Sequence, residues 1–530
     1  MQEGEFRSRK GEARPWWEHP ALLVSLVLAS MLPLLWPDIP PLLDLPGHMG
    51  RYRVQLDIEQ SAVLQYYYDF EWALIGNLGV DLLVELLAPL IGLEPAVKLV
   101  ILMIPPLTVT GLLWTAYEVH GRLPPTAFFA IPFAYNFPFL FGFANFSLSM
   151  ALALIAFAYW LRLGRLGRVW LRAFLFVPIS MGLWVVHAFG WGTLGVLAFS
   201  SELVRQFDRG HNFFSSGFRS GIHCLALAPP VALVLLWRSE ASGVTTDWFN
   251  ADKKIDWILM VLRDRWEVFD VGALAIVALL LLFAMVTRRM EYSRNLAASA
   301  LFLTIVFVLL PRIVFGSAYA DMRLAPYLFA IGIIAIRFPP VASHRFIEAF
   351  AIAALAFVGA RLGGNTVSAW LYDQSYDREL AALEHVPRGA RLVSFVGRPC
   401  VEPWAMSRLL HLPGIALVRR EAFSNDQWTM AGAQLLQVRY RAGFPFIRDP
   451  TQIVTARRCR MEGWRPITLA LSSFPRDAFD YVWLISPPPF EAAAVADLRP
   501  IWRSGRSVLY RVEKMAKSET PAGSGTLPTK

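Results

Sequence analysis

The first two thirds of the chain alternate between long apolar segments and short charged ones. An apolar segment of about 17–25 residues with few charges is typical of a helix that crosses a membrane. Several of the segments are shorter or contain proline, so their ends are less sharply defined. Eleven segments are predicted to cross the membrane: residues 20–37, 95–117, 124–141, 143–161, 173–187, 189–204, 220–237, 270–287, 295–314, 323–337 and 346–363.

Two of the stretches between these segments have an amphipathic pattern. Residues 38–94 contain two helix-like stretches, 47–65 and 78–91, joined by the aromatic run 66–72. Tyrosine and tryptophan in such a run are typical of a layer in the headgroup zone of a membrane. Residues 238–269 carry tryptophans among charged residues and predict a further interfacial helix.

From residue 364 onward the apolar blocks give way to mixed polar and apolar sequence. Period-two patterns predict strands at 391–396, 481–485 and 507–512, and helical spacing predicts a helix within 429–440. These features together predict a small α/β domain.

The pattern therefore predicts two domains and a tail. Residues 1–363 form a helical membrane domain and residues 364–513 form the α/β domain. Residues 514–530, rich in Lys, Ser, Thr, Gly and Pro, are expected to be disordered. The first apolar segment lacks a small-residue cleavage site, which favours a retained helix over a removed signal peptide. We find no internal repeat, which argues against a transporter.

Composition and charge agree with a multi-pass membrane protein. Hydrophobic residues make up 55% of the chain and charged residues only 17%, which is too apolar for a soluble protein. Lysine and arginine cluster at alternate ends of the segments, and a cytoplasmic N-terminus places most of them inside. The net charge of +9 is therefore explained by topology and not by binding of nucleic acid. An odd number of spans places the α/β domain outside.

The chain has three cysteines. Cys224 falls within a predicted span and is expected to be a small core residue. Cys400 and Cys459 both lie in the outer domain, where oxidising conditions permit a disulfide. Two free buried thiols are the alternative.

Polar side chains gather at the predicted outer face. Asp44, His48 and Arg51 follow the first span directly. Such groups are costly beside lipid, so we expect them to hold a ligand or to do chemistry, the alternative being a solvated turn before an amphipathic helix. The other polar residues placed at this face are Asn77, Asp81, Asn136, Asn145, His187, Asp321 and Arg323.

Each of these residues also has a structural explanation. A histidine that ends a span, as His187 does, is more often hydrogen-bonded in place than catalytic, and Asp81 can cap or solvate an amphipathic helix. Together, however, two carboxylates at one membrane face can accept a proton or bind a divalent ion, and an arginine can hold a phosphate. This inventory suits transfer from a phosphate-linked lipid donor, with Arg323 stabilising the departing phosphate.

The chain resembles the GT-C superfamily of integral membrane glycosyltransferases, in particular bacterial forms that use a polyprenyl-phosphate-sugar donor. The resemblance rests on the order of the elements and on two motifs. Asp-x-Pro-x-His-x-x-Arg is matched by Asp44, Pro46, His48 and Arg51, and Asn-Leu-x-x-Asp by Asn77, Leu78 and Asp81.

The resemblance implies sugar transfer from a polyprenyl-phosphate donor to a glycan, lipid or protein acceptor at the outer face of a bacterial inner membrane. It implies that Asp44 is the general base or acceptor-orienting carboxylate and that Asp81 is the second catalytic carboxylate. The residues expected to bind substrate are His48, Arg51, Asn77, His187, Asp321 and Arg323. An adjacent acidic pair is absent from the loop 38–94. The sequence therefore leaves open whether a divalent metal ion is a cofactor.

Two other functions fit the pattern. The first is a transporter or flippase for a lipid-linked saccharide, which needs polar groups through the membrane depth. The second is a non-catalytic assembly factor whose outer domain binds a partner. The residues that would suit a protein-binding or saccharide-stacking surface are Trp404, His411, Phe423, Trp428 and Phe444, although aromatic residues in a small domain are more often core.

Overall fold

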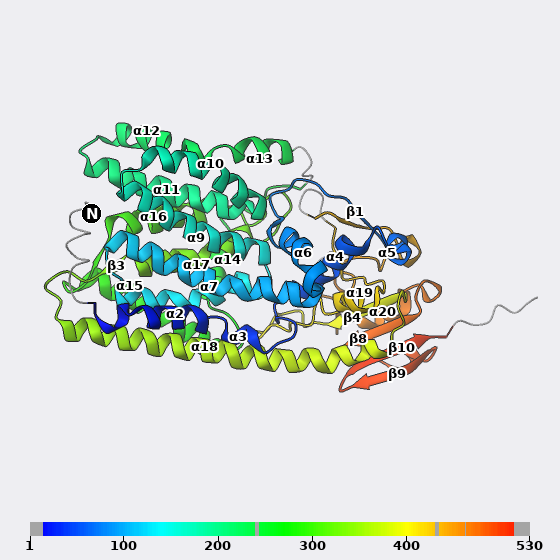
Figure 1. Ribbon diagram of the computed structural model, residues 1–530. Coiled ribbons are helices and arrows are strands. Elements are labelled where there is room, and N and C mark those ends of the chain that lie inside the picture. Colours follow the sequence, from blue (N-terminus) through cyan, green and yellow to red (C-terminus); the bar gives the residue numbers. More distant parts are fainter. Residues whose placement is uncertain (1–13, 239–242, 430–433, 462, 514–530) are drawn as a thin grey trace, which may run out of the picture.

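Helices lie side by side over most of the molecule, and a mixed β-sheet lies at one end of them (Figure 1). The computed structural model describes residues 14–238, 243–429, 434–461 and 463–513. We call the end of the helical bundle next to the sheet the domain end, and the opposite end the far end. The predicted disordered tail 514–530 lies outside the described residues.

Five helices in the described residues are long and apolar enough to cross a membrane. They are α7 (Leu93–His120), α9 (Ala144–Arg165), α10 (Val169–Val186), α15 (Glu267–Val286) and α18 (His344–Leu380), the last continuing into η4 (Ala381–His385). Two shorter apolar helices are α2 (Pro20–Ala29) and α16 (Arg294–Leu309). The predicted fold class, a helical multi-pass membrane protein with a C-terminal α/β domain, is confirmed, while the count of eleven spans stays a prediction.

The remaining predicted spans differ in regularity. Two match single helices, α11 (Ala188–Asp208) and α17 (Ala320–Ile334). The others are interrupted, and prolines lie in or beside each of them. These interrupted spans are α2 with α3 (Leu32–Leu35), η2 (Pro125–Tyr135) with α8 (Phe137–Phe141), and α12 (Phe213–Cys224) with η3 (Leu225–Leu227) and α13 (Pro230–Arg238). Proline lacks a backbone N–H and removes an intrahelical hydrogen bond, so an apolar segment rich in proline does not form one straight helix.

The stretch 38–94 contains three helices, α4 (Leu45–Asp57), α5 (Ala62–Tyr67) and α6 (Gly79–Ile91), where two were predicted. The aromatic run does not form a free layer. Its strand β1 (Tyr68–Phe70) pairs antiparallel with β5 (Leu436–Val438), and Tyr67 and Tyr68 are buried. In the second stretch, 238–269, the described helix is α14 (Ala251–Leu259).

The prediction of a helix at 429–440 is wrong for residues 434–440, which the structure describes. Residues 434–440 include the strand β5, and residues 430–433 lie outside the described residues. The apolar positions that suggested a helix include Leu436 and Tyr440, and these pack into the core of the C-terminal domain. Pairing with a distant strand therefore overrides the local helical spacing.

The three predicted strands are confirmed as β4 (Leu392–Gly397), β8 (Tyr481–Ile485) and β10 (Ser507–Val512). They form the centre of a six-stranded sheet in the order β7-β6-β4-β8-β10-β9. β4 is parallel to β6 and β8, and β10 is antiparallel to β8 and β9. The other strands are β6 (Ile453–Thr455), β7 (Arg465–Pro466), β9 (Leu498–Ser504), β2 (Glu291–Tyr292) and β3 (Ile336–Arg337), and the short helices are α19 (Gly414–Arg420), α20 (Ile467–Ser473), η1 (Trp16–Glu18), η5 (Arg441–Gly443), η6 (Arg476–Ala478) and η7 (Ala492–Val495).

The sheet shares one of its faces with the bundle. Alternate strand residues such as Leu392, Trp483 and Leu509 belong to the large core that runs through the helices. Their neighbours Val393 and Val482 belong to a second core within the domain, as the period of two requires. Helix α18 passes residue 363 without a break and ends at Leu380. The domain is therefore attached to the bundle by a continuous helix and a continuous core.

A disulfide joins Cys400 to Cys459, with a Cα–Cα distance of 5.4 Å. It connects the chain after β4 to the chain after β6. Of the two alternatives that the sequence left open, a disulfide and two free thiols, the structure has the disulfide. Cys224 is free and half-buried.

Replacement of both Cys400 and Cys459 by alanine is expected to lower the free energy of unfolding by about 2–4 kcal/mol, because the bond restricts a long loop in the unfolded chain. The measurement is the thermal unfolding midpoint of the full chain in detergent. Cys224→Ala is the matched control and should leave the midpoint close to that of the parent. An unchanged midpoint in the double variant would contradict the prediction.

Candidate functional site

Asp81 is fully buried in the first turn of α6 and has protein partners on both carboxylate oxygens. Its Oδ1 forms an ion pair with Arg51 of α4. Its Oδ2 accepts a hydrogen bond from Asn145 Nδ2 of α9 at 3.0 Å, and the same amide donates to the backbone oxygen of Asn77 at 2.9 Å. The second sequence motif and Arg51 therefore form a joint that fixes α4 against α6 and α9. Their predicted roles toward substrate stay predictions.

Asp321 is also paired with a protein cation. Lys254 Nζ of α14 lies 3.2 Å from Asp321 Oδ2 and donates further hydrogen bonds to the backbone oxygens of Phe307 and Leu310 at 2.7 and 2.8 Å. The ion pair ties α14 to the start of α17 and to the end of α16.

His187 stands between α10 and α11 and caps the second of these helices. Its Nδ1 accepts a hydrogen bond from the backbone N–H of Phe189 at 3.1 Å. The ring packs edge-on against Phe146, with centroids 5.8 Å apart. This is the arrangement of a structural N-cap.

Asp44 directly precedes α4 and is held by the turn that follows α8. Its backbone N–H donates to the oxygen of Phe141 at 3.0 Å, and Leu43 N–H donates to Leu140 at 3.2 Å. Gly142 has φ +107°, and a Cβ at this position would lie 2.7 Å from the backbone nitrogen of Asp44. Only glycine fits this close approach, which places the carboxylate at the domain end.

The side chains around the Asp44 carboxylate come from the C-terminal region. His411 Nε2 lies 3.9 Å from Asp44 Oδ1, and His411 Nδ1 lies 3.8 Å from Asp426 Oδ2. The half-exposed ring of Trp428 contacts His411 and His48, with ring centroids 4.6 and 5.1 Å apart. The predicted residues Asp44 and His48 are thus brought together with His411, Asp426 and Trp428. The sequence offered His411 and Trp428 only for the binding surface of an assembly factor, and it did not single out Asp426. No local spacing connects positions so far apart in the chain.

The charges in this cluster perturb one another. Burial raises the pKa of Asp44 to about 7. The positive charge of His411 opposes this rise in pKa, the carboxylate of Asp449 adds to it, and Arg398 and Arg323 oppose it. Asp44 is therefore a carboxylate that gains and loses a proton near neutral pH, as a general base requires.

The two histidines respond in opposite directions. Burial lowers the pKa of His48 well below its usual value, so this ring is neutral. Burial also acts to lower the pKa of His411, but the contact with the Asp426 carboxylate and the charges of Asp449 and Asp44 outweigh it and raise the pKa overall. Of the two rings, His411 is thus the one whose surroundings favour the protonated form.

Arg323, in the first turn of α17, is a buried cation that is 8% exposed. Its guanidinium lies over the rings of Phe143 and Phe189, 4.4 and 5.5 Å from their centroids. Among the described residues it has no ion-pair or hydrogen-bond partner, and its Nε is buried and unsatisfied. An unmatched buried charge is costly, and an anionic ligand bound beside Arg323 would compensate it.

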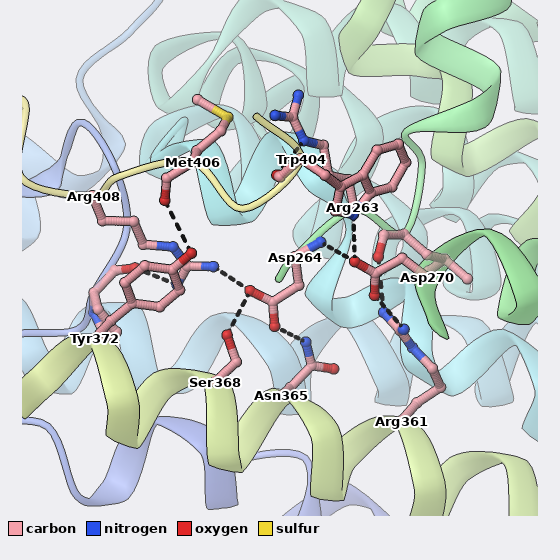
Figure 2. Close-up of polar contacts among 12 residues, drawn as sticks. Arg263, Asp264, Asp270, Arg361, Asn365, Ser368, Tyr372, Trp404, Met406 and Arg408 are labelled. Carbon is pink, nitrogen blue, oxygen red and sulfur yellow. Dashed lines mark hydrogen bonds and ion pairs between the residues drawn. The ribbon is translucent and has the colours of Figure 1, made fainter. Parts of the chain in front are cut away.

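A polar network holds the chain before His411 against the bundle (Figure 2). Asp264 accepts hydrogen bonds from Ser368 Oγ at 2.8 Å and Asn365 Nδ2 at 2.9 Å, both on α18, and forms an ion pair with Arg408. Tyr372 Oη donates to the backbone oxygen of Met406 at 2.9 Å.

A second carboxylate completes this network. Asp270 accepts hydrogen bonds from Trp404 Nε1 at 2.8 Å and from Arg361 at 2.7 Å (Figure 2). Arg263 donates to the backbone oxygens of Trp404 and Pro403 at 2.9 and 2.7 Å. The segment that carries His411 to Asp44 is therefore fixed by buried, charge-assisted hydrogen bonds from α18, from α15 and from the chain before α15.

A metal ion has no ligand set in this region. Within the described ranges, no group of three or more His, Cys, Asp or Glu side chains is placed to hold one. The divalent ion that the sequence left open therefore stays without assigned residues.

No protein-family model matches the chain, and no curated protein matches it. Among solved structures, the chain is similar to ArnT from Cupriavidus metallidurans bound to undecaprenyl phosphate. The sequence identity is 12% and the TM-score is 0.46, and the match covers 94% of this chain and 98% of that chain.

Removal of the charge of Arg51 and removal of the charge of Arg323 are expected to affect stability differently. Arg51→Met leaves Asp81 buried without its cation and should lower the free energy of unfolding by about 3–5 kcal/mol. Arg323→Met removes a charge that has no partner and should leave stability unchanged or raised. Thermal unfolding of the two full-length variants in detergent makes the comparison, and a loss of stability in Arg323→Met as large as that in Arg51→Met would refute it.

Gly142→Ala is expected to lower the free energy of unfolding by at least about 1 kcal/mol, because alanine is strained at this φ and its Cβ meets the backbone of Asp44. Gly182→Ala in α10 is the matched control, since a Cβ there meets nothing within 4 Å. Alanine favours a helix interior, so this variant should keep or gain stability. Equal unfolding midpoints for the two variants would rule out the close approach.

Proposed function

We propose that the chain is a membrane glycosyltransferase that moves a sugar from a polyprenyl-phosphate donor to an acceptor at the domain end of the bundle. One observation carries the proposal. Burial raises the pKa of the Asp44 carboxylate to about 7, and the buried Arg323, which has no ion-pair or hydrogen-bond partner among the described residues, lies close enough for its charge to act on that carboxylate. The cluster thus offers a base and an anion site together.

The reaction uses the two groups in distinct ways. The acceptor hydroxyl gives its proton to the Asp44 carboxylate while its oxygen forms a bond to the anomeric carbon of the sugar. The bond between that carbon and the phosphate oxygen breaks, and the polyprenyl phosphate leaves with the electron pair. The guanidinium of Arg323 stabilises the negative charge that develops on the leaving phosphate.

The neighbouring side chains serve binding and position. The ring of Trp428 lies beside His48 and His411 and offers an apolar face for the sugar. Of the residues predicted to bind substrate, we propose that His48 and Arg323 contact it directly. The roles proposed for Arg51, Asn77, Asp81, His187 and Asp321 are to hold the helices that carry the site, because each has a protein partner.

The distribution of buried ion pairs favours a transferase over a flippase. Arg172 pairs with Glu202 near the far end of the bundle, between α10 and α11. Among the buried arginines that the structure describes, Arg323, which has no ion-pair or hydrogen-bond partner there, lies at the domain end. A carrier needs polar groups along its whole path through the membrane. We place the domain end outside a bacterial inner membrane, with membrane lipid around the bundle and the N-terminus in the cytoplasm.

Asp44→Asn keeps the shape of the side chain and removes its basicity, and it is expected to lower sugar transfer at least about 100-fold. The assay follows a polyprenyl-phosphate donor labelled in the sugar, with the full chain in proteoliposomes and a cell-envelope extract as the source of acceptors. New glycosidic products and released polyprenyl phosphate are counted.

Asp57→Asn, at the other end of the same helix, is the matched control and should keep its transfer rate, because in the described residues the ion-pair partner of Asp57 is the half-buried Arg53. Full transfer by Asp44→Asn would remove Asp44 from the mechanism. Movement of labelled lipid across the bilayer without a new glycosidic bond would favour the flippase.

A further inference from the structure

His411 is 5% exposed and lies between two carboxylates that come from distant parts of the chain. One ring nitrogen faces Asp44 at 3.9 Å and the other faces Asp426 at 3.8 Å. Both distances are those of ion pairs. A neutral imidazole has one N–H donor, whereas the protonated ring has two, so a carboxylate at each nitrogen fits the protonated form.

The Asp426 carboxylate, which faces His411 Nδ1, is held in position by its own hydrogen bonds. The residue is fully buried, and its Oδ1 accepts hydrogen bonds from Ser424 Oγ at 2.6 Å and Gln427 Nε2 at 3.2 Å. Its Oδ2 is buried without a hydrogen-bond partner in the described residues and faces the His411 Nδ1, which is likewise unsatisfied. The free oxygen of Asp426 is therefore directed at the histidine.

The histidine is also restrained mechanically. Its segment follows the Arg408 ion pair with Asp264, and Tyr376 Oη donates to the backbone oxygen of Arg408 at 2.8 Å. On the next helix, a Cβ at Gly414 would lie 2.4 Å from the backbone oxygen of Pro46, so α19 contacts the start of α4 without a side chain between them. The approach of His411 to Asp44 is thus fixed by close backbone packing.

We propose that His411, held by Asp426, is a positioning residue whose positive charge keeps Asp44 in its ionised, proton-accepting form, so that the C-terminal domain completes the active site. This inference rests on the proposed transferase function. It assigns to the domain a part in the chemistry that neither the sequence motifs nor the bundle supplies.

Other charges act on the pair, and the sign of the His411 effect follows from them. The groups that act on Asp44 or on His411, or that feel the charge of Asp44, are Arg323, Arg398, Asp426, Asp449, His48, Tyr319 and Tyr376. Asp449 makes ionisation of Asp44 harder, and the two arginines make it easier. When the positive charge of His411 is lost, less positive charge offsets the effect of the Asp449 carboxylate on Asp44, so the pKa of Asp44 rises.

The first test is the pH dependence of kcat/KM for sugar transfer in the full chain. In His411→Gln the acid limb is expected to move to higher pH by about one unit or more, with the rate recovered in alkaline buffer. His411→Lys keeps a cation and should keep the acid limb. The matched control His344→Gln removes an exposed histidine that lies beside Glu348 and Trp17. A uniform fall in rate at every pH, with no shift of the limb, would overturn the inference.

Asp426→Asn supplies a second variant in case His411→Gln folds poorly. It lowers the affinity of His411 for a proton and should shift the acid limb in the same direction by a smaller amount. An unshifted limb in folded Asp426→Asn contradicts the role of Asp426.

A readout without activity separates this inference from the proposed function. In full-length protein labelled with ¹⁵N-histidine, the signal of His411 is identified by its absence in His411→Gln, and its titration is followed by NMR. Asp44→Asn is expected to lower the pKa of His411, because one of its carboxylates is lost. If the parent forms no glycosidic product, the proposed function fails whatever the titration shows. If the pKa of His411 is the same in Asp44→Asn as in the parent, the inference is overturned even when the enzyme is active.

Discussion

The organisation of the molecule depends on the cost of burying charge. Where an arginine is buried away from water, its charge must be matched by carboxylates or by carbonyl oxygens. Of the buried arginines in the described ranges, Arg51, Arg172, Arg361 and Arg408 each pair with a carboxylate, and Arg263 donates to backbone oxygens. Arg323 is the exception, because its guanidinium has aromatic rings beneath it and no acceptor. Such an exception is sustained where a ligand supplies the missing anion.

The second constraint is the close contact between the start of α4 and its surroundings. Gly142 approaches the backbone of Asp44, Gly414 approaches the backbone of Pro46, and a Cβ at Gly47 would lie 2.6 Å from the ring of Trp428. These contacts bring the bundle and the C-terminal domain to a shared seam. Together with the continuous helix α18, they place the domain along one side of the candidate site. The raised pKa of Asp44 follows from its burial there.

Local pattern carries the sequence predictions that succeeded. The strands at 481–485 and 507–512 were predicted to the residue because alternate apolar positions fit the two cores on either face of the sheet. Asp44 and Arg323 were singled out because polar groups at a membrane face are unexpected. The helix predicted at 429–440 was wrong because its apolar residues serve strand pairing with a distant segment. The part played by His411 depends on a contact with residues far away along the chain, and no spacing rule encodes such a contact.

The central claim is that Arg323 binds the phosphate of a lipid donor beside Asp44. The most direct test is to titrate the full-length protein in detergent with farnesyl phosphate and to measure the heat of binding by isothermal titration calorimetry. The parent and Arg323→Met are compared. The account predicts saturable binding by the parent and an affinity at least about tenfold weaker in the variant, as expected for loss of a charge-assisted hydrogen bond in a buried site. Equal affinity of the two proteins would contradict it.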